Sequence, residues 1–227
     1  MSRSRELARL MRELRAEGIT DPKVLEAMER VPRELFVPQE LRHHSLRNIP
    51  LSIGHGQTIS QPFVVALMTQ APSLTGTERV LEVGTGSGYQ CAILAELAGS
   101  VVSIERIEPL ASTARELLTR LGYLNIQVVV GDGSRGYAEL APYDAIVVTA
   151  ASPGVPQPLV DQLVDGGRLI VPVGSRFSQQ LTLYVKRAGK LIPHRLGPVR
   201  FVPLIGESAW NDRVVGTFLH DCWWEEV

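Results

Sequence analysis

The chain has 227 residues, of which 44% are hydrophobic, and its 23 Lys and Arg are balanced by 24 Asp and Glu. One good-sized core is therefore possible, and the charge balance argues against a polyanionic partner such as nucleic acid. The charged N-terminus has no signal-peptide core, no apolar run has membrane-spanning length, and the two cysteines form no metal-binding pattern. We therefore expect a cytoplasmic protein with no membrane segment and no metal site.

The first quarter of the chain predicts two helices followed by a loop. Apolar residues share one helical face over 3–17, and a second helix is expected after Asp21, which precedes Pro22 as an N-cap precedes the first helical residue. Residues 31–62 are rich in Pro, Gly and isolated polar residues and contain IGHGQTISQP at 53–62, which follows neither a helical nor a strand period. We expect an ordered functional loop here that enters a helix at its end.

From residue 79 onward, short apolar strands alternate with helical stretches. This alternation predicts βαβ units, and hence an α/β fold with a doubly wound, mainly parallel sheet covered on both faces. Two further strand-like runs follow without a long helix between them, which predicts an antiparallel hairpin at the sheet edge. The expected strands are 80–83, 101–104, 126–130, 145–149, 168–173, 181–186 and 199–204, and the expected helices are 88–98, 109–121 and 157–164.

The strongest local signal is LEVGTGSG at 81–88, where the first parallel strand must turn into its helix. Glycines at such a turn let the backbone approach a ligand, and the helix N-terminus adds N–H donors. A dinucleotide site requires the spacing GxGxxG, but Tyr89 replaces its third small residue and the glycines read GxGxG. This spacing favours S-adenosylmethionine over NAD, and a Gly-rich turn without a ligand is the alternative. The predicted cofactor contacts in the turn are Gly84, Thr85, Gly86, Ser87 and Gly88.

Acidic residues follow the next two strands. Glu105 ends the second strand, where its carboxylate can accept hydrogen bonds from both ribose hydroxyls. Asp132, with Gly133, follows the third strand at the same sheet edge and could accept from the adenine amino group. Each acid also has a purely structural explanation, as a helix N-terminal residue for Glu105 and as part of a turn for Asp132. The three strand ends together predict a site for a nucleoside that carries a small charged group.

With these motifs the chain resembles the protein-L-isoaspartate O-methyltransferases of the bacterial type, a family of class I methyltransferases. The resemblance runs through 31–206 and includes VLEVGTGSGYQ at 80–90, SIER at 103–106, GDG at 131–133, YDAIVVTAA at 143–151, GGRLIVPVG at 166–174 and RFVPLIG at 200–206. The last of these and IGHGQTISQP at 53–62 are specific to the family, whereas the central ones belong to the wider class.

The resemblance implies a reaction and a set of substrate residues. Methyl transfer from S-adenosylmethionine to the free α-carboxylate of isoaspartyl residues in damaged proteins would be the activity. Ser60 would be the active-site hydroxyl, although spacing alone leaves a helix cap equally possible for it. The substrate contacts implied by the resemblance are Ile53, Thr58, Ile59, Val202, Pro203 and Leu204.

Two other functions are compatible with a nucleoside site at this sheet edge. A class I methyltransferase acting on a nucleobase or small molecule is the main alternative, but an exocyclic-amine enzyme would be expected to have an Asn/Asp-Pro-Pro-aromatic motif where Thr149 to Ser152 stand. A non-catalytic nucleoside-binding module would have no need of the 53–62 loop. We therefore expect an enzyme whose partners are isoaspartyl proteins and peptides.

The expected organisation is one compact, monomeric domain in three parts. Residues 1–62 form a helical cap and substrate loop, 63–206 form the methyltransferase core, and 207–227 form a tail that matches no family pattern. The tail contains Trp210, Trp223 and Trp224, which we expect to pack against the domain rather than to form a dimer contact.

Overall fold

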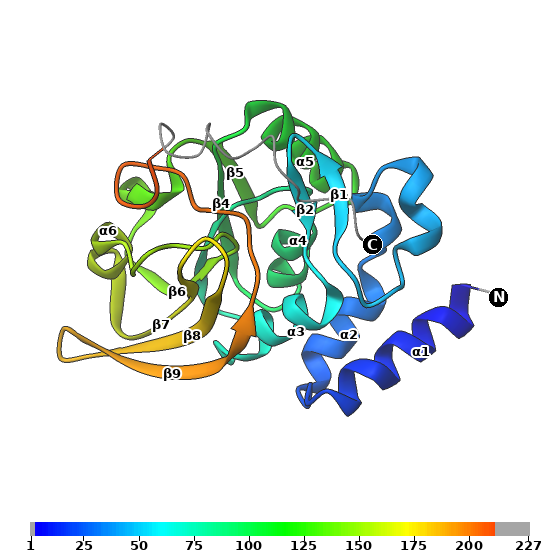
Figure 1. The fold of residues 1–227 in the computed structure, drawn as a ribbon, viewed down its shortest axis with the longest axis horizontal. Coiled ribbons are helices and arrows are strands. Elements are labelled where there is room, and N and C mark those ends of the chain that lie inside the picture. Colours follow the sequence, from blue (N-terminus) through cyan, green and yellow to red (C-terminus); the bar gives the residue numbers. More distant parts are fainter. Residues whose placement is uncertain (1–2, 212–227) are drawn as a thin grey trace.

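The computed structural model describes residues 3–211, and a seven-stranded sheet with the order β5-β4-β3-β6-β7-β8-β9 forms its centre (Figure 1). The first five strands in this order are parallel to one another, whereas β8 is antiparallel to β7 and β9 is antiparallel to β8. The predicted α/β class with its antiparallel edge hairpin is confirmed. The strands are β3 (Arg79–Val83), β4 (Ser100–Glu105), β5 (Ile126–Val130), β6 (Tyr143–Val148), β7 (Leu163–Gly174), β8 (Gln179–Arg187) and β9 (Lys190–Val199).

Both faces of the parallel strands are buried, because successive strand residues point to opposite sides and belong to two different hydrophobic clusters. Val80 and Val101 belong to a hydrophobic cluster with residues of five helices, whereas Leu81 and Val102 belong to a second cluster with Leu159 of the sixth. The helices of the first cluster are α1 (Arg3–Ala16), α2 (Pro22–Arg30), α3 (Pro62–Gln70), α4 (Tyr89–Ala95) and α5 (Glu108–Arg120), and the sixth is α6 (Gln157–Asp161). None of the helices within 3–211 is long and apolar enough to cross a membrane.

Local signals set the ends of the early helices. Asp21 is the N-cap of α2, with its carboxylate 2.9 Å from the main-chain N–H of Lys23, and Pro22 is the first helical residue, as predicted. Apolar residues of α1 face the core. α1, α2 and α3 contact one another, and α2 and α3 also contact α4 (Figure 1). The N-terminal helices are therefore joined to the helix that follows the glycine turn.

The region 31–62 contains more regular structure than its sequence indicates. Two 3₁₀ helices, Arg33–Phe36 and Gln39–His44, precede a small antiparallel sheet of β1 (Leu51–Gly54) and β2 (Gln57–Ile59). The turn between these strands has left-handed φ angles at three consecutive residues, including His55 at 53°. Strands this short show no clear period, which explains why the sequence predicts only a loop.

The expected strand at 199–204 is wrong. The edge strand is β9, which pairs along its length with β8 and ends at Val199. β9 contains Pro193 and Pro198, which an edge strand can accommodate. Because most of its residues are exposed, its sequence shows no alternation of apolar and polar residues. The expected helix at 157–164 is also too long, since α6 ends at Asp161 and β7 begins two residues later.

The start of the C-terminal tail continues to pack against the domain. The ring of Trp210 lies 4.9 Å from the guanidinium carbon of Arg176, and its main-chain N–H donates to the carbonyl of Leu204 at 3.0 Å. Trp223 and Trp224 lie outside the described residues.

Candidate active site

The glycine turn joins β3 to α4 at the carboxyl edge of the sheet, where the order of strands reverses on either side of β3. Gly84, Gly86 and Gly88 have φ angles of 99°, 52° and 88°, a region that other residues rarely adopt. The N–H of Gly84 donates to the carbonyl of Ile104 at 2.8 Å, and the hydroxyl of Thr149 donates to the carbonyl of Gly84 at 2.7 Å. The turn is therefore held between the ends of β4 and β6.

Glu105 lies beside this turn. One carboxylate oxygen accepts from the N–H of Gly86 and the other from the N–H of Ile107, each at 2.9 Å. The side chain is buried, yet each carboxylate oxygen keeps acceptor capacity beyond one hydrogen bond. The structure thus brings the predicted ribose acceptor into contact with the predicted glycine turn.

Asp132 has structural hydrogen bonds of its own. One oxygen accepts from the N–H and hydroxyl of Ser134 at 2.9 and 2.7 Å, and the other accepts from the N–H of Glu207 at 2.8 Å. Next to it, a Cβ on Gly133 would lie 2.5 Å from a methyl of Val83, so only glycine allows this close approach. Asp132 therefore connects the end of β5 to the segment that follows Leu204, and its contact with adenine stays a prediction.

The β1–β2 hairpin lies against the glycine turn. A methyl group placed on Gly86 would be 3.4 Å from the terminal Cδ1 of Ile53 in β1. Thr58 and Ile59 are in β2, and the Ile59 side chain is buried, so only its main chain is available to a ligand. The structure therefore places the predicted substrate segment next to the predicted cofactor segment.

Ser60 lies between β2 and α3 and does not cap the helix. The N-cap residue of α3 is Gln61, and the N–H of Phe63 in the first turn donates to the side-chain oxygen of Asn48 at 2.9 Å rather than to Ser60. Among residues 3–211 the Ser60 hydroxyl has no hydrogen-bond partner, and only its carbonyl is used, by Arg33. The capping explanation for this serine is thereby removed.

Val202, Pro203 and Leu204 form an extended segment beside the end of β6. The N–H of Ala151 donates to the carbonyl of Val202 at 2.8 Å, and the N–H of Leu204 donates to the carbonyl of Ala151 at 2.7 Å. Leu204 is buried, whereas Val202 and Pro203 are half-buried. These two residues are the ones that can contact a ligand through their side chains.

A chain of buried polar side chains connects the glycine turn to β4 and β3, and no pattern in the sequence predicts it. The hydroxyls of Thr85 and Ser103 are 2.6 Å apart, and Ser103 donates to the carboxyl of Glu82 at 2.5 Å. Burial raises the pKa of Glu82 to about 8, against the opposing effect of its hydrogen bonds with Ser103 and Cys91 and with some help from the charge of Glu105. Glu82 is therefore mostly protonated at neutral pH.

This buried carboxyl predicts a pH-dependent stability. In the unfolded chain the pKa of Glu82 is near the ordinary value of 4.5, whereas in the folded protein it is about 8, so the folded protein loses stability as pH rises through this window. Glu82→Gln has no such group. Urea unfolding of both proteins at about pH 5 and about pH 8 should show the wild type losing stability relative to the variant. A pH-independent difference would show that the folded and unfolded carboxyl groups titrate alike.

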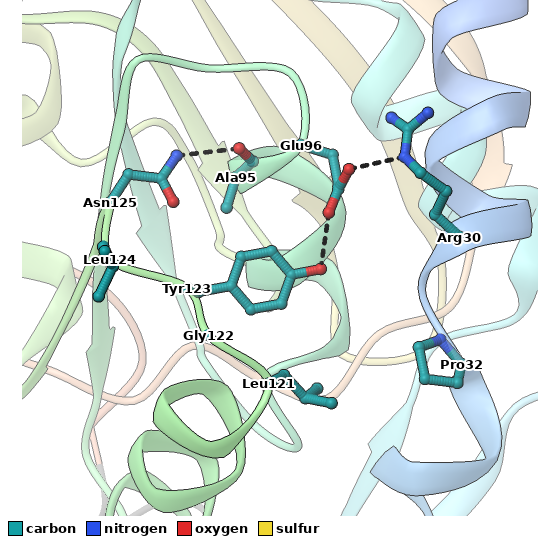
Figure 2. A pocket seen from close by; sticks show the side chains of 9 residues that line it. All are labelled: Arg30, Pro32, Ala95, Glu96, Leu121, Gly122, Tyr123, Leu124 and Asn125. Atoms are coloured by element: carbon teal, nitrogen blue, oxygen red, sulfur yellow. Dashed lines mark hydrogen bonds and ion pairs between the residues drawn. The ribbon is translucent and has the colours of Figure 1, made fainter.

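A surface pocket of about 520 Å³ lies away from this site (Figure 2). It is at the amino edge of the sheet, between the ends of α2 and α4 and the residues that precede β5. The polar groups that line the pocket already bond to one another, because the Glu96 carboxylate accepts hydrogen bonds from Arg30 at 2.8 Å and from the hydroxyl of Tyr123 at 2.9 Å. This pocket contains none of the residues predicted to bind cofactor or substrate.

A doubly wound sheet with a GxGxG turn after β3 and an acid at the end of β4 defines a class I methyltransferase. The model of the protein-L-isoaspartate(D-aspartate) O-methyltransferase family matches residues 5–209, so the chain belongs to this family. Its reaction is the methylation of isoaspartyl residues in damaged proteins, with S-adenosylmethionine as the methyl donor. The match includes the N-terminal helices, which lie outside the 31–206 range of the resemblance.

Curated relatives and solved structures agree with this assignment. A protein-L-isoaspartate O-methyltransferase of Methanoculleus marisnigri is 56% identical over 202 residues, which are 89% of this chain and 92% of the relative. One of Hyperthermus butylicus is 50% identical over 93% of both chains. A solved structure with this name superposes with a TM-score of 0.79 at 32% identity, covering 89% of this chain and 67% of that one. A Plasmodium falciparum chain named for the same activity, solved in complex with S-adenosyl-L-homocysteine, has a TM-score of 0.76 at 29% identity and covers 86% of this chain and 96% of its own.

Proposed function

We propose that Ser60 orients the free α-carboxylate of an L-isoaspartyl residue beside the cofactor held by the glycine turn. The observation that carries this proposal is the combination of a Ser60 hydroxyl that has no hydrogen-bond partner among residues 3–211 with the approach of Ile53, in the hairpin just before Ser60, to Gly86. A hydroxyl with no partner in the described part of the chain can donate to a substrate carboxylate. The contact between the hairpin and the glycine turn supports this proposal, because the predicted substrate segment then lies next to the predicted cofactor segment.

The residues at the strand ends suit the cofactor. S-Adenosylmethionine supplies an activated methyl group on a sulfonium sulfur. Residues 84–88 approach it with their backbone, Glu105 accepts hydrogen bonds from its ribose, and Asp132 with Gly133 lies where the adenine is expected. Because Glu105 is buried and hydrogen-bonded to the turn, the groups that would bind the cofactor are already held in place before it binds.

The acceptor needs no general base. A free α-carboxylate has a pKa of about 3.5, so it is ionised and nucleophilic at neutral pH. What the protein must supply is alignment and partial removal of water, and alignment alone can be worth roughly 7 to 11 kcal/mol. An orienting hydroxyl such as that of Ser60 meets this requirement without an Asp-His pair.

Peptide recognition would use main-chain groups of the 202–204 segment. The carbonyl of Val202 and the N–H of Leu204 are already bonded to Ala151, and Pro203 has no N–H. In an extended segment successive residues point to opposite sides, so the carbonyl of Pro203 faces away from Ala151. It would accept from a substrate N–H, which is compatible with many side-chain sequences.

We further propose that residues 1–62 serve as cap and substrate loop, 63–206 as catalytic core and 207–227 as an appended tail of one monomeric domain. The buried thiol of Cys91 and the balanced charge favour a reducing cytoplasm and a protein rather than a nucleic-acid substrate.

The proposed function is tested with paired peptides that differ only in Asp or isoAsp at one position. With labelled S-adenosylmethionine, the isoaspartyl peptide should become a base-labile methyl ester and its aspartyl partner should not. A change of the residues that flank the isoaspartate should alter turnover little. Equal labelling of both peptides, or of neither, would contradict the proposal.

A further inference from the structure

Arg33 is a fully buried cation that has no acidic partner among residues 3–211. Its side chain is 1% exposed and forms no salt bridge with any residue in the described part of the chain. Instead the guanidinium donates to three carbonyls of the segment before α3, those of Ser45 at 2.9 Å, Ile49 at 3.2 Å and Ser60 at 2.9 Å. A single side chain therefore fixes the main chain on both sides of the β1–β2 hairpin.

The same guanidinium also contacts the start of α4. Its carbon lies 5.1 Å from the ring centroid of Tyr89, which directly follows Gly88 of the glycine turn, and Tyr89 in turn meets the ring of Phe36 edge to face. Burial lowers the pKa of Arg33 to about 10, so the group is still cationic at neutral pH. A buried charge is costly unless it is fully hydrogen-bonded, and here carbonyls and an aromatic ring supply that compensation.

We propose that Arg33 is a positioning residue for the methyl transfer, which fixes the main chain of Ser60 relative to the glycine turn. The guanidinium donates to the carbonyl of Ser60 and also contacts the ring of Tyr89, at the end of the turn. The inference rests on the proposed role of Ser60, because Arg33 acts through that residue. Lys could not replace Arg33, because one ammonium group cannot match the planar set of donors that reaches three separate carbonyls.

Arg33→Met tests the proposal, with Arg33→Lys as a milder variant and Arg30→Met as the control. Arg30 is exposed and pairs with Glu96, the C-cap residue of α4, so its loss should leave kcat unchanged. Arg33→Met should lower kcat about 100-fold, as a small misplacement of a reacting group can, and should leave the affinity for S-adenosylhomocysteine unchanged. Arg33→Lys should fall between the wild type and Arg33→Met. Amide hydrogen exchange should rise in 45–62 while β3 to β7 stay protected.

The double variant Arg33→Met/Ser60→Ala separates positioning from a general loss of structure. If Arg33 acts through Ser60, the double variant should be no slower than the slower of the two single variants. Losses that multiply, or a normal kcat in both Arg33 variants, would overturn the role of Arg33. Full turnover of Ser60→Ala alone would instead remove the role of Ser60 in the proposed function, and the inference about Arg33 with it.

Discussion

Replacing Ser60 with alanine should lower kcat for an isoaspartyl peptide about 100-fold, because the acceptor carboxylate loses its orienting donor. The change removes a hydroxyl that has no partner in the described part of the protein, so the free energy of unfolding should stay nearly constant. Affinity for S-adenosylhomocysteine should also stay constant. Steady-state kinetics at saturating cofactor, together with calorimetric titration of S-adenosylhomocysteine, measures the two effects separately.

Ser52→Ala is the matched control for this substitution. Ser52 is an exposed serine on the same hairpin, and its hydroxyl makes only a long local contact of 3.4 Å with the N–H of Gly54. Its replacement should leave kcat unchanged. If Ser60→Ala also turned over at the wild-type rate, Ser60 would have no part in the reaction.

Glu105→Ala should weaken the binding of S-adenosylhomocysteine by about 100-fold or more. Two hydrogen bonds from ribose hydroxyls to a carboxylate are worth about 3 kcal/mol together at the low end of the usual range. The substitution also removes the acceptor for Gly86 N–H and so loosens the glycine turn. Isothermal titration with S-adenosylhomocysteine measures this loss directly.

The control for Glu105→Ala is Glu108→Ala. Glu108 has the same charge, lies three residues further on and is exposed at the start of α5, so it should affect binding little. Comparable losses in both variants would mean that general electrostatics, not a specific contact of Glu105, governs cofactor binding. Tight binding by Glu105→Ala would remove the ribose assignment altogether.

The sequence predicts the structure best where a short motif determines the local backbone and its place in the sheet. The glycines at 84–88 and Glu105 could be found because the ends of consecutive parallel strands lie at one edge of a sheet, so the order of motifs gives their place in space. The start of α2 at Pro22 follows from capping chemistry that acts over a few residues. Each of these signals is contained within a short stretch of chain.

Contacts that depend on distant residues could not be predicted. Arg33 has no periodic pattern around it, and its partners at Ser60 and Tyr89 are 27 and 56 positions away, so nothing in its neighbourhood marks it as buried. Glu82 reads as an ordinary acid in a strand until the burial of its carboxyl is known. The cap on Phe63 comes from Asn48, which left Ser60 ambiguous from sequence alone.

The misplaced edge strand has a related cause. Apolar residues at 199–204 suggested a strand, but Phe201 and Leu204 are buried because the segment crosses over the end of β6. The true strand β9 is held mainly by main-chain pairing with β8 and has no buried face of its own. An apolar pattern in a sequence indicates which residues are buried. Here the buried residues are in 199–204, whereas the residues that pair with β8 are in β9.

A crystal structure with S-adenosylhomocysteine and an isoaspartyl peptide tests the central claim most directly. The nucleoside should lie along the glycine turn with its ribose on Glu105, and the peptide carboxylate should accept from the Ser60 hydroxyl while facing the cofactor sulfur. A cofactor bound elsewhere, or a carboxylate that lies out of reach of both Ser60 and the sulfur, would contradict the account.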